Sequence, residues 1–103
     1  MILVKVRLSP ADKGGHVSSL LVKNHGAPIV CAGISALVLN TINSIETLTS
    51  DVFSLKHEQE GGFIEISFPN KLSPEAQLLM ASLMLGIKAA LAEYPKEIKI
   101  KYE

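Results

Sequence analysis

The chain of 103 residues contains one cysteine, no tryptophan, two tyrosines and three phenylalanines. A single cysteine excludes a disulfide within the chain and is typical of proteins from a reducing compartment. Ten basic residues balance ten acidic residues, so the net charge gives no general attraction for nucleic acid, and we expect no direct nucleic-acid partner. One cysteine and three scattered histidines do not have the spacing of a zinc site, so we expect no metal and no cofactor.

The sequence also lacks a signal peptide pattern and a long apolar run. Apolar and basic side chains alternate in its first segment, whereas a signal peptide has a basic segment followed by an apolar one. The longest apolar stretch, from Ile29 to Leu39, is too short to span a bilayer. We therefore expect a cytoplasmic protein without a membrane contact. Because 48% of the residues are apolar and 19% are charged, we expect one globular domain over residues 1–103.

Alternation and helical spacing of the apolar residues predict the secondary structure. Alternating segments bounded by turn formers predict strands over residues 2–8, 17–23, 52–57, 63–68 and 97–102. Apolar residues at helical spacing predict helices over 29–48 and 74–93, the second with Ser73 as N-cap and Pro74 in its first turn. Helices of this length need a sheet to bury against. The order β-β-α-β-β-α-β therefore predicts an α+β two-layer sandwich with a mainly antiparallel sheet and two helices.

The only cysteine, Cys31, lies at the predicted start of the first helix, six residues after His25. Free N–H groups and partial positive charge at a helix N-terminus favour a thiolate. A nearby imidazole can accept the thiol proton, and N–H groups near Ala32 could hold an oxyanion. This arrangement is what a cysteine nucleophile needs. The alternative, a small buried hydrophobic residue, is left open by the spacing alone.

Three further residues are candidates for the same site or for a competing one. Ser35 lies one helical turn after Cys31, where it would orient the pair or simply allow close packing of the helix. His16 lies at the far end of the second predicted strand, too distant from the cysteine if that strand is extended. We expect His57, before the second hairpin turn, to face solvent.

The block Ile29-Val30-Cys31-Ala32-Gly33-Ile34-Ser35-Ala36-Leu37 after His25, together with Tyr94 to Ile100, resembles the bacterial ribosomal-processing cysteine protease family Prp. The resemblance implies a cysteine endopeptidase that removes a short N-terminal extension from the large-subunit ribosomal protein numbered twenty-seven. It implies that Cys31 is the nucleophile, that His25 is the general base and that Ser35 supports them. It also implies a homodimer and no cofactor.

The connection between His25 and Cys31 departs from the pattern of the family that the chain resembles. Asn24 replaces a glycine, Gly26 replaces an alanine, and Pro28 stands where many members have an aspartate. We expect Asn24, Gly26, Ala27 and Pro28 to lie beside the substrate. Asparagine tolerates the left-handed backbone that a tight turn at position 24 would need.

The second predicted helix is apolar around much of its circumference, beyond the stripe that one packed face requires. We therefore expect a homodimer. The positions concerned are Leu78, Leu79, Met80, Leu83, Met84, Leu85, Ile87, Ala90 and Leu91. The alternative to a protease is a non-catalytic homodimeric module that binds the ribosome or a peptide, with Cys31 in a packing role.

Overall fold

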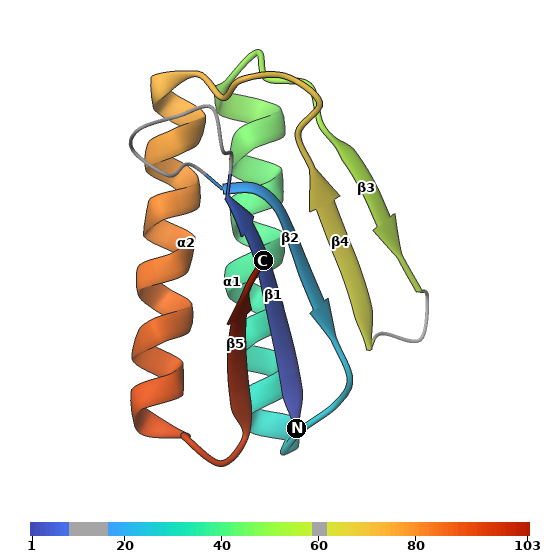
Figure 1. Ribbon diagram of the computed structural model, residues 1–103, viewed down its shortest axis with the longest axis vertical. Coiled ribbons are helices and arrows are strands. Elements are labelled where there is room, and N and C mark those ends of the chain that lie inside the picture. Colours follow the sequence, from blue (N-terminus) through green and yellow to red (C-terminus); the bar gives the residue numbers. More distant parts are fainter. Residues whose placement is uncertain (9–16, 59–61) are drawn as a thin grey trace.

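The computed structural model describes residues 1–8, 17–58 and 62–103, and its elements follow the predicted order. The expected turn over residues 9–15 and the competing His16 lie outside the described residues. The elements are β1 (Ile2–Leu8), β2 (Val17–Lys23), α1 (Pro28–Leu48), β3 (Ser54–His57), β4 (Phe63–Ser67), α2 (Pro74–Glu93) and β5 (Ile98–Tyr102). The predicted α+β fold class is confirmed, with both helices on one face of the sheet (Figure 1).

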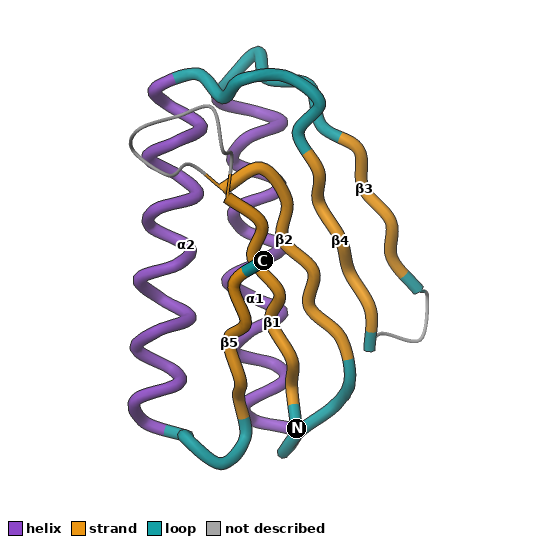
Figure 2. The backbone as a smooth tube through the Cα atoms, viewed as in Figure 1, coloured by secondary structure: helices purple, strands orange, loops and turns teal. Residues whose placement is uncertain are grey.

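The sheet has five strands in the order β3-β4-β2-β1-β5. The pairs β1–β2, β2–β4 and β3–β4 are antiparallel, whereas β5 lies parallel to β1 at one edge. A parallel pair needs a long connection, and α2 with the segments around it supplies one. Figure 2 shows the resulting two layers, with the strands on one side and the helices on the other.

The core lies between the sheet and the two helices. Alternation along β1 buries Ile2, Val4 and Val6 toward the helices and leaves the residues between them on the other face. Each helix contributes one buried stripe. The stripe of α1 is Val30, Ile34, Val38, Thr41, Ile42 and Ile45, and that of α2 is Ala76, Met80, Leu83, Met84 and Ile87. No helix covers the opposite face of the sheet among the described residues.

The wide apolar face predicted for α2 divides into two parts. Met80, Leu83 and Met84 are buried within the chain, so they are not free for a partner. Leu78 and Leu85 remain 71% exposed each. The apolar surface left on α2 is therefore narrower than the sequence pattern predicts.

Both helices are long and apolar enough to cross a membrane when judged by length and composition alone. The apolar stretch from Ile29 to Leu39 is part of a longer helix, which continues to Leu48. The core helix of a water-soluble protein passes the same test. Here each helix packs one face into the core described above.

The start of α2 is capped as the sequence predicts. The hydroxyl of Ser73 accepts a hydrogen bond from the Ala76 N–H at 3.1 Å. The carboxylate of Asp51 in turn accepts hydrogen bonds from the hydroxyl of Ser73 and, at 2.8 Å, from its backbone N–H. These bonds, the hydroxyl of Ser73 first among them, hold the pKa of Asp51 below its ordinary value of 3.8.

Candidate active site

The connection from β2 to α1 is a tight turn that carries His25. Asn24 has a left-handed backbone, with φ of 71°, and its N–H donates to the carbonyl of Gly62 at 2.9 Å. Asparagine is one of the few residues that adopt this conformation readily, which confirms its suitability for the turn. Helix α1 begins at Pro28, so only Gly26 and Ala27 separate His25 from the helix that carries Cys31.

Cys31 is half-buried in the first turns of α1, with its sulfur turned back toward the preceding loop. The Gly26 N–H donates a hydrogen bond to Sγ at 3.1 Å, and the thiol lies 3.7 Å from the carbonyl oxygen of Gly26. An N–H group aimed at sulfur stabilises the thiolate more than the thiol, because a hydrogen bond to an ionised acceptor is stronger. The loop thus places a hydrogen-bond donor directly on the sulfur of Cys31.

The expected position of the oxyanion donors is corrected by the start of the helix. Ala32 is the fifth residue of α1, so regular helix geometry directs its N–H to the Pro28 carbonyl. The N–H groups of Val30 and Cys31 both donate to the carbonyl of Ala27, at 3.0 and 2.9 Å. Of the N–H groups around the thiol, that of Gly26 points at the sulfur.

His25 is exposed, and its imidazole lies against the second hairpin. A Cβ atom built on Gly62 would be 2.6 Å from Nε2 of His25, and Gly62 has a φ of 82°. Glycine is required there by both the backbone and the close approach. No hydrogen bond joins the imidazole to the Cys31 thiol among the described residues. The structure therefore places the two groups on one short loop without bonding them to each other.

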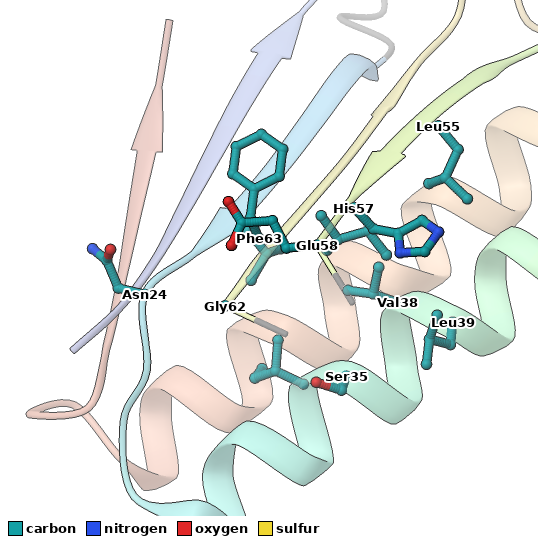
Figure 3. A pocket seen from close by; sticks show the side chains of 12 residues that line it. Asn24, Ser35, Val38, Leu39, Leu55, His57, Glu58, Gly62 and Phe63 are labelled. Carbon is teal, nitrogen blue, oxygen red and sulfur yellow. The ribbon is translucent and has the colours of Figure 1, made fainter. Parts of the chain in front are cut away.

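Ser35 lines a hollow of about 270 Å³ between α1 and the β3–β4 hairpin. Figure 3 shows Ser35, Val38 and Leu39 on α1, with Leu55 and His57 on the facing strand. The complete lining is Val22, Asn24, Ile34, Ser35, Val38, Leu39, Leu55, His57, Glu58, Gly62, Phe63 and Ile64. Most of the side chains that line the hollow are apolar. Ser35 lies one helical turn after Cys31, on the same face of α1, and it also lines this hollow.

Glu97 is a residue of this site that the sequence does not reveal. Its carboxylate accepts a hydrogen bond from the Ala27 N–H at 3.1 Å. A Cβ atom at Gly26 would lie 2.8 Å from the same carboxylate oxygen. The carbonyl of Glu97 also accepts from the N–H of Ile2 at 2.8 Å. Glu97 therefore fixes the loop to the start of β1, and only its place in the folded chain reveals this.

The start of α1 depends on this contact, because the helix has no side-chain cap of its own. Ala27 is the N-cap residue and has no side-chain oxygen to offer. The carboxylate of Glu97 lies there instead, where the helix dipole favours a negative charge. The short loop is thus held by a residue that lies 70 positions further along the chain.

The part of the chain that the structure describes does not meet the requirements of a metal site. No group of three or more histidine, cysteine, aspartate or glutamate side chains there could hold an ion. The chemistry available is that of a thiol at the start of a helix, a backbone N–H aimed at its sulfur, and an imidazole on the same loop. These features define the class of thiol hydrolases.

Comparison with known proteins identifies the family. The model of the family described as cysteine protease Prp matches residues 2–99. The chain belongs to this family and is a cysteine protease. It is 27% identical over 107 residues to the ribosomal processing cysteine protease Prp of Staphylococcus aureus, covering 98% of this chain and 100% of the relative. It is 29% identical over 111 residues to the protein of the same name from Bacillus subtilis, covering 97% and 96%.

Two solved structures of the S. aureus protease share the fold over the full length of both chains. The complex with a covalently linked product peptide has a TM-score of 0.91 and 28% identity. The complex with a substrate peptide has a TM-score of 0.88 and 27% identity. The predicted resemblance to the Prp family is thus confirmed by sequence and by structure.

Proposed function

We propose that residues 1–103 act as one protease domain in which Cys31 is the nucleophile and His25 the general base. The observation that carries this assignment is the 3.1 Å hydrogen bond from the Gly26 N–H to Sγ. It holds the sulfur on the loop that bears His25, at the start of a helix. In free enzymes catalytic hydrogen bonds are often long and tighten only when substrate binds. The proposal requires the exposed imidazole of His25 to turn from Gly62 toward the thiol when substrate binds.

The reaction is acyl transfer through a thioester. His25 takes the proton of the Cys31 thiol, and the thiolate forms a bond to the scissile carbonyl carbon. As the negative charge passes from sulfur to the carbonyl oxygen, the Gly26 N–H that donated to Sγ is the donor we assign to that oxygen. The C–N bond breaks as His25 returns the proton to the leaving amine. Water then hydrolyses the thioester, with His25 accepting its proton, and restores the thiol.

The substrate we propose is an extended peptide that lies along the hollow beside Ser35. Strand β3 is at an edge of the sheet, borders this hollow, and all four of its residues are exposed. A free edge binds an extended peptide through backbone hydrogen bonds, while a neighbouring hollow selects a side chain. The apolar residues that line the hollow, among them the buried Val38 and the exposed Leu39 and Leu55, suit an apolar side chain. Ser35, which also lines the hollow, supports the positioning of the peptide.

We further propose that this peptide is the N-terminal extension of the large-subunit ribosomal protein numbered twenty-seven. The names of the relatives support ribosomal processing, and the S. aureus structures support binding of a peptide in this fold. We place the cleavage in the cytoplasm, and it requires no cofactor, membrane or nucleic acid. The experiment uses a synthetic peptide that spans the junction between the extension and the mature start of the host's protein.

Two histidine variants test the assignment of the base. We expect His25→Ala to lower the cleavage rate about 100-fold or more, as for loss of a general base. His16→Ala is the matched control and keeps the rate near that of the wild type. The reverse result would refute the assignment of His25 and would favour the competing histidine.

The protease and the non-catalytic module differ in the reactivity of Cys31. A thiol activated for catalysis is alkylated by iodoacetamide at neutral pH faster than a free thiol in solution, whereas a packing residue is inert. An unreactive Cys31 in a folded protein that still binds the peptide would support the binding module.

We also propose that the protein is a homodimer that uses the exposed part of α2. Leu78 and Leu85 are two helical turns apart on that face and both are exposed. Leu85→Glu would place a charge there and should shift the protein from dimer to monomer in light scattering at micromolar concentration. Met84 is unsuitable for this test because it is buried in the core. A wild-type protein that is monomeric would refute the dimer.

A further inference from the structure

The balanced charge of the sequence conceals a separation of charge in the fold. Six of the ten basic residues lie on strand positions that face away from the helices, together with Glu65. Glu103, which follows β5, reaches Lys5 and Arg7 on the same face. The described residues of this face, which we call the open sheet face, therefore carry a formal charge of +4, from six basic against two acidic residues, in a chain whose formal net charge is zero. The basic residues are Lys5, Arg7, Lys23, Lys56, Lys99 and Lys101, and the acidic ones are Glu65 and Glu103.

The register of the sheet arranges these side chains in rows across the strands. One row runs Lys101, Lys5, Leu21, Glu65 and Lys56 from β5 to β3. The next row runs Lys99, Leu3, Lys23 and Phe63.

Lys5 and Lys101 are direct neighbours on paired strands, an arrangement in which like charges are destabilising. A sheet face shaped by stability alone would alternate the signs of such neighbours.

Internal ion pairs neutralise little of this charge. Glu103 is 3.9 Å from the ammonium of Lys5 and 3.4 Å from the guanidinium of Arg7, so one carboxylate serves two cations. In the described part of the chain, Lys23, Lys99 and Lys101 have no ion-pair partner. Their charges are therefore free to meet an external anion.

The chemistry of the face also indicates which polyanion fits. Among the described residues, the large apolar side chains in the interior of this face (Leu3, Leu21 and Phe63) are half-buried and none is exposed, so the face offers little to insert into a lipid layer. Phe63 is half-buried on it, with its ring on the side of the sheet away from α1 (Figure 3). A sheet face that combines lysines with an aromatic ring suits the phosphates and unstacked bases of single-stranded RNA.

We propose that the open sheet face is a docking surface for single-stranded RNA, bound mainly through its phosphates. It lies on the side of the sheet opposite the α1 face that carries the hollow beside Ser35. Phe63 borders both surfaces, but none of the basic residues of the open sheet face lines the hollow, so RNA bound through these residues leaves the hollow accessible to peptide. Binding of this kind places the protease on a particle that contains RNA, independently of the cleavage step.

The test measures binding of a fluorescein-labelled single-stranded RNA of about 20 nucleotides to the full chain by fluorescence anisotropy. With four to six phosphate contacts, we expect log K to fall with log salt at a slope of about −3 to −4. The double variant Lys99→Glu/Lys101→Glu removes the positive charge of the open sheet face. It should weaken binding at least about 10-fold and make the salt dependence shallower by roughly 1.4.

A matched charge reversal away from the open sheet face is the control. Lys88→Glu/Lys96→Glu makes the same change in net charge on α2 and the turn before β5. We expect it to keep most of the RNA affinity, and both double variants should cleave peptide at the wild-type rate. Equal weakening by the two double variants would overturn the proposal, as would absence of binding at 50 mM salt. Equally tight binding of polyglutamate would overturn the choice of RNA.

Discussion

The contact between Glu97 and the loop of the active site provides a quantitative test of how that loop is held. Glu97→Ala removes the acceptor of the Ala27 N–H, which is a charge-assisted hydrogen bond of 3.1 Å. Such bonds contribute about 1.5–3 kcal/mol when buried. Because Glu97 and Ala27 are half-buried, water replaces part of the contact, and we expect a loss of about 1–2 kcal/mol.

The assay is thermal unfolding, combined with cleavage of the peptide. For a domain of this size each kcal/mol shifts Tm by about 4–8 °C, so Glu97→Ala should be clearly resolved. The same loop carries the Gly26 N–H that points at Sγ, so kcat should fall about 10-fold with a smaller change in KM. Glu97→Gln keeps an oxygen acceptor and should recover about half of the loss in both measurements.

A surface glutamate supplies the control for this prediction. Glu46→Ala removes an exposed acidic residue from α1 and should change stability by no more than about 0.5 kcal/mol. A Glu97→Ala protein with the wild-type Tm and kcat would refute the role of Glu97. A Glu97→Gln protein no better than Glu97→Ala would show that the accepting oxygen is not the cause.

Three further predictions concern stability. Gly33→Ala adds a Cβ with nothing within 4 Å in an exposed helical position, so it should stabilise the fold by about 0.5–1 kcal/mol in denaturant unfolding. Gly62→Ala should destabilise by about 1–2 kcal/mol and slow peptide cleavage, because it strains a left-handed backbone and displaces His25; wild-type behaviour would contradict this. The lowered pKa of Asp51 stabilises the fold above pH 3.8, and this contribution is lost as pH falls through the folded pKa. Asp51→Asn should therefore flatten the dependence of stability on pH below about 4, and an unchanged acid profile would exclude Asp51 as its source.

Local patterns were sufficient for most of the fold. The alternation in residues 2–8 and 17–23 and the capped helix over 74–93 predicted β1, β2 and α2 with their observed bounds. Strand β3 begins at Ser54, two residues later than predicted, because Val52 and Phe53 precede the ladder with β4. The parallel pairing of β5 with β1 depends on where α2 returns the chain, which no local pattern encodes.

The sequence was sufficient to name candidate residues for the site, whose roles stay predictions, but it did not reveal their contacts. Cys31 and His25 could be identified because the helix start and the turn are both encoded nearby in the sequence. The link between Glu97 and Ala27 spans 70 positions, and the sequence contains no signal for it. The open sheet face was hidden for a similar reason, since net charge says nothing about which face each charge occupies.

The central claim is that Cys31 is the nucleophile of a peptidase. The most direct test is the rate at which Cys31→Ser cleaves the junction peptide, compared with the wild-type protein. We predict that the variant keeps the wild-type fold, because the two side chains are nearly the same size, with a change in stability of about 1 kcal/mol or less. We predict that it shows no detectable cleavage. A folded Cys31→Ser protein that cleaves within a few-fold of the wild-type rate would contradict the account.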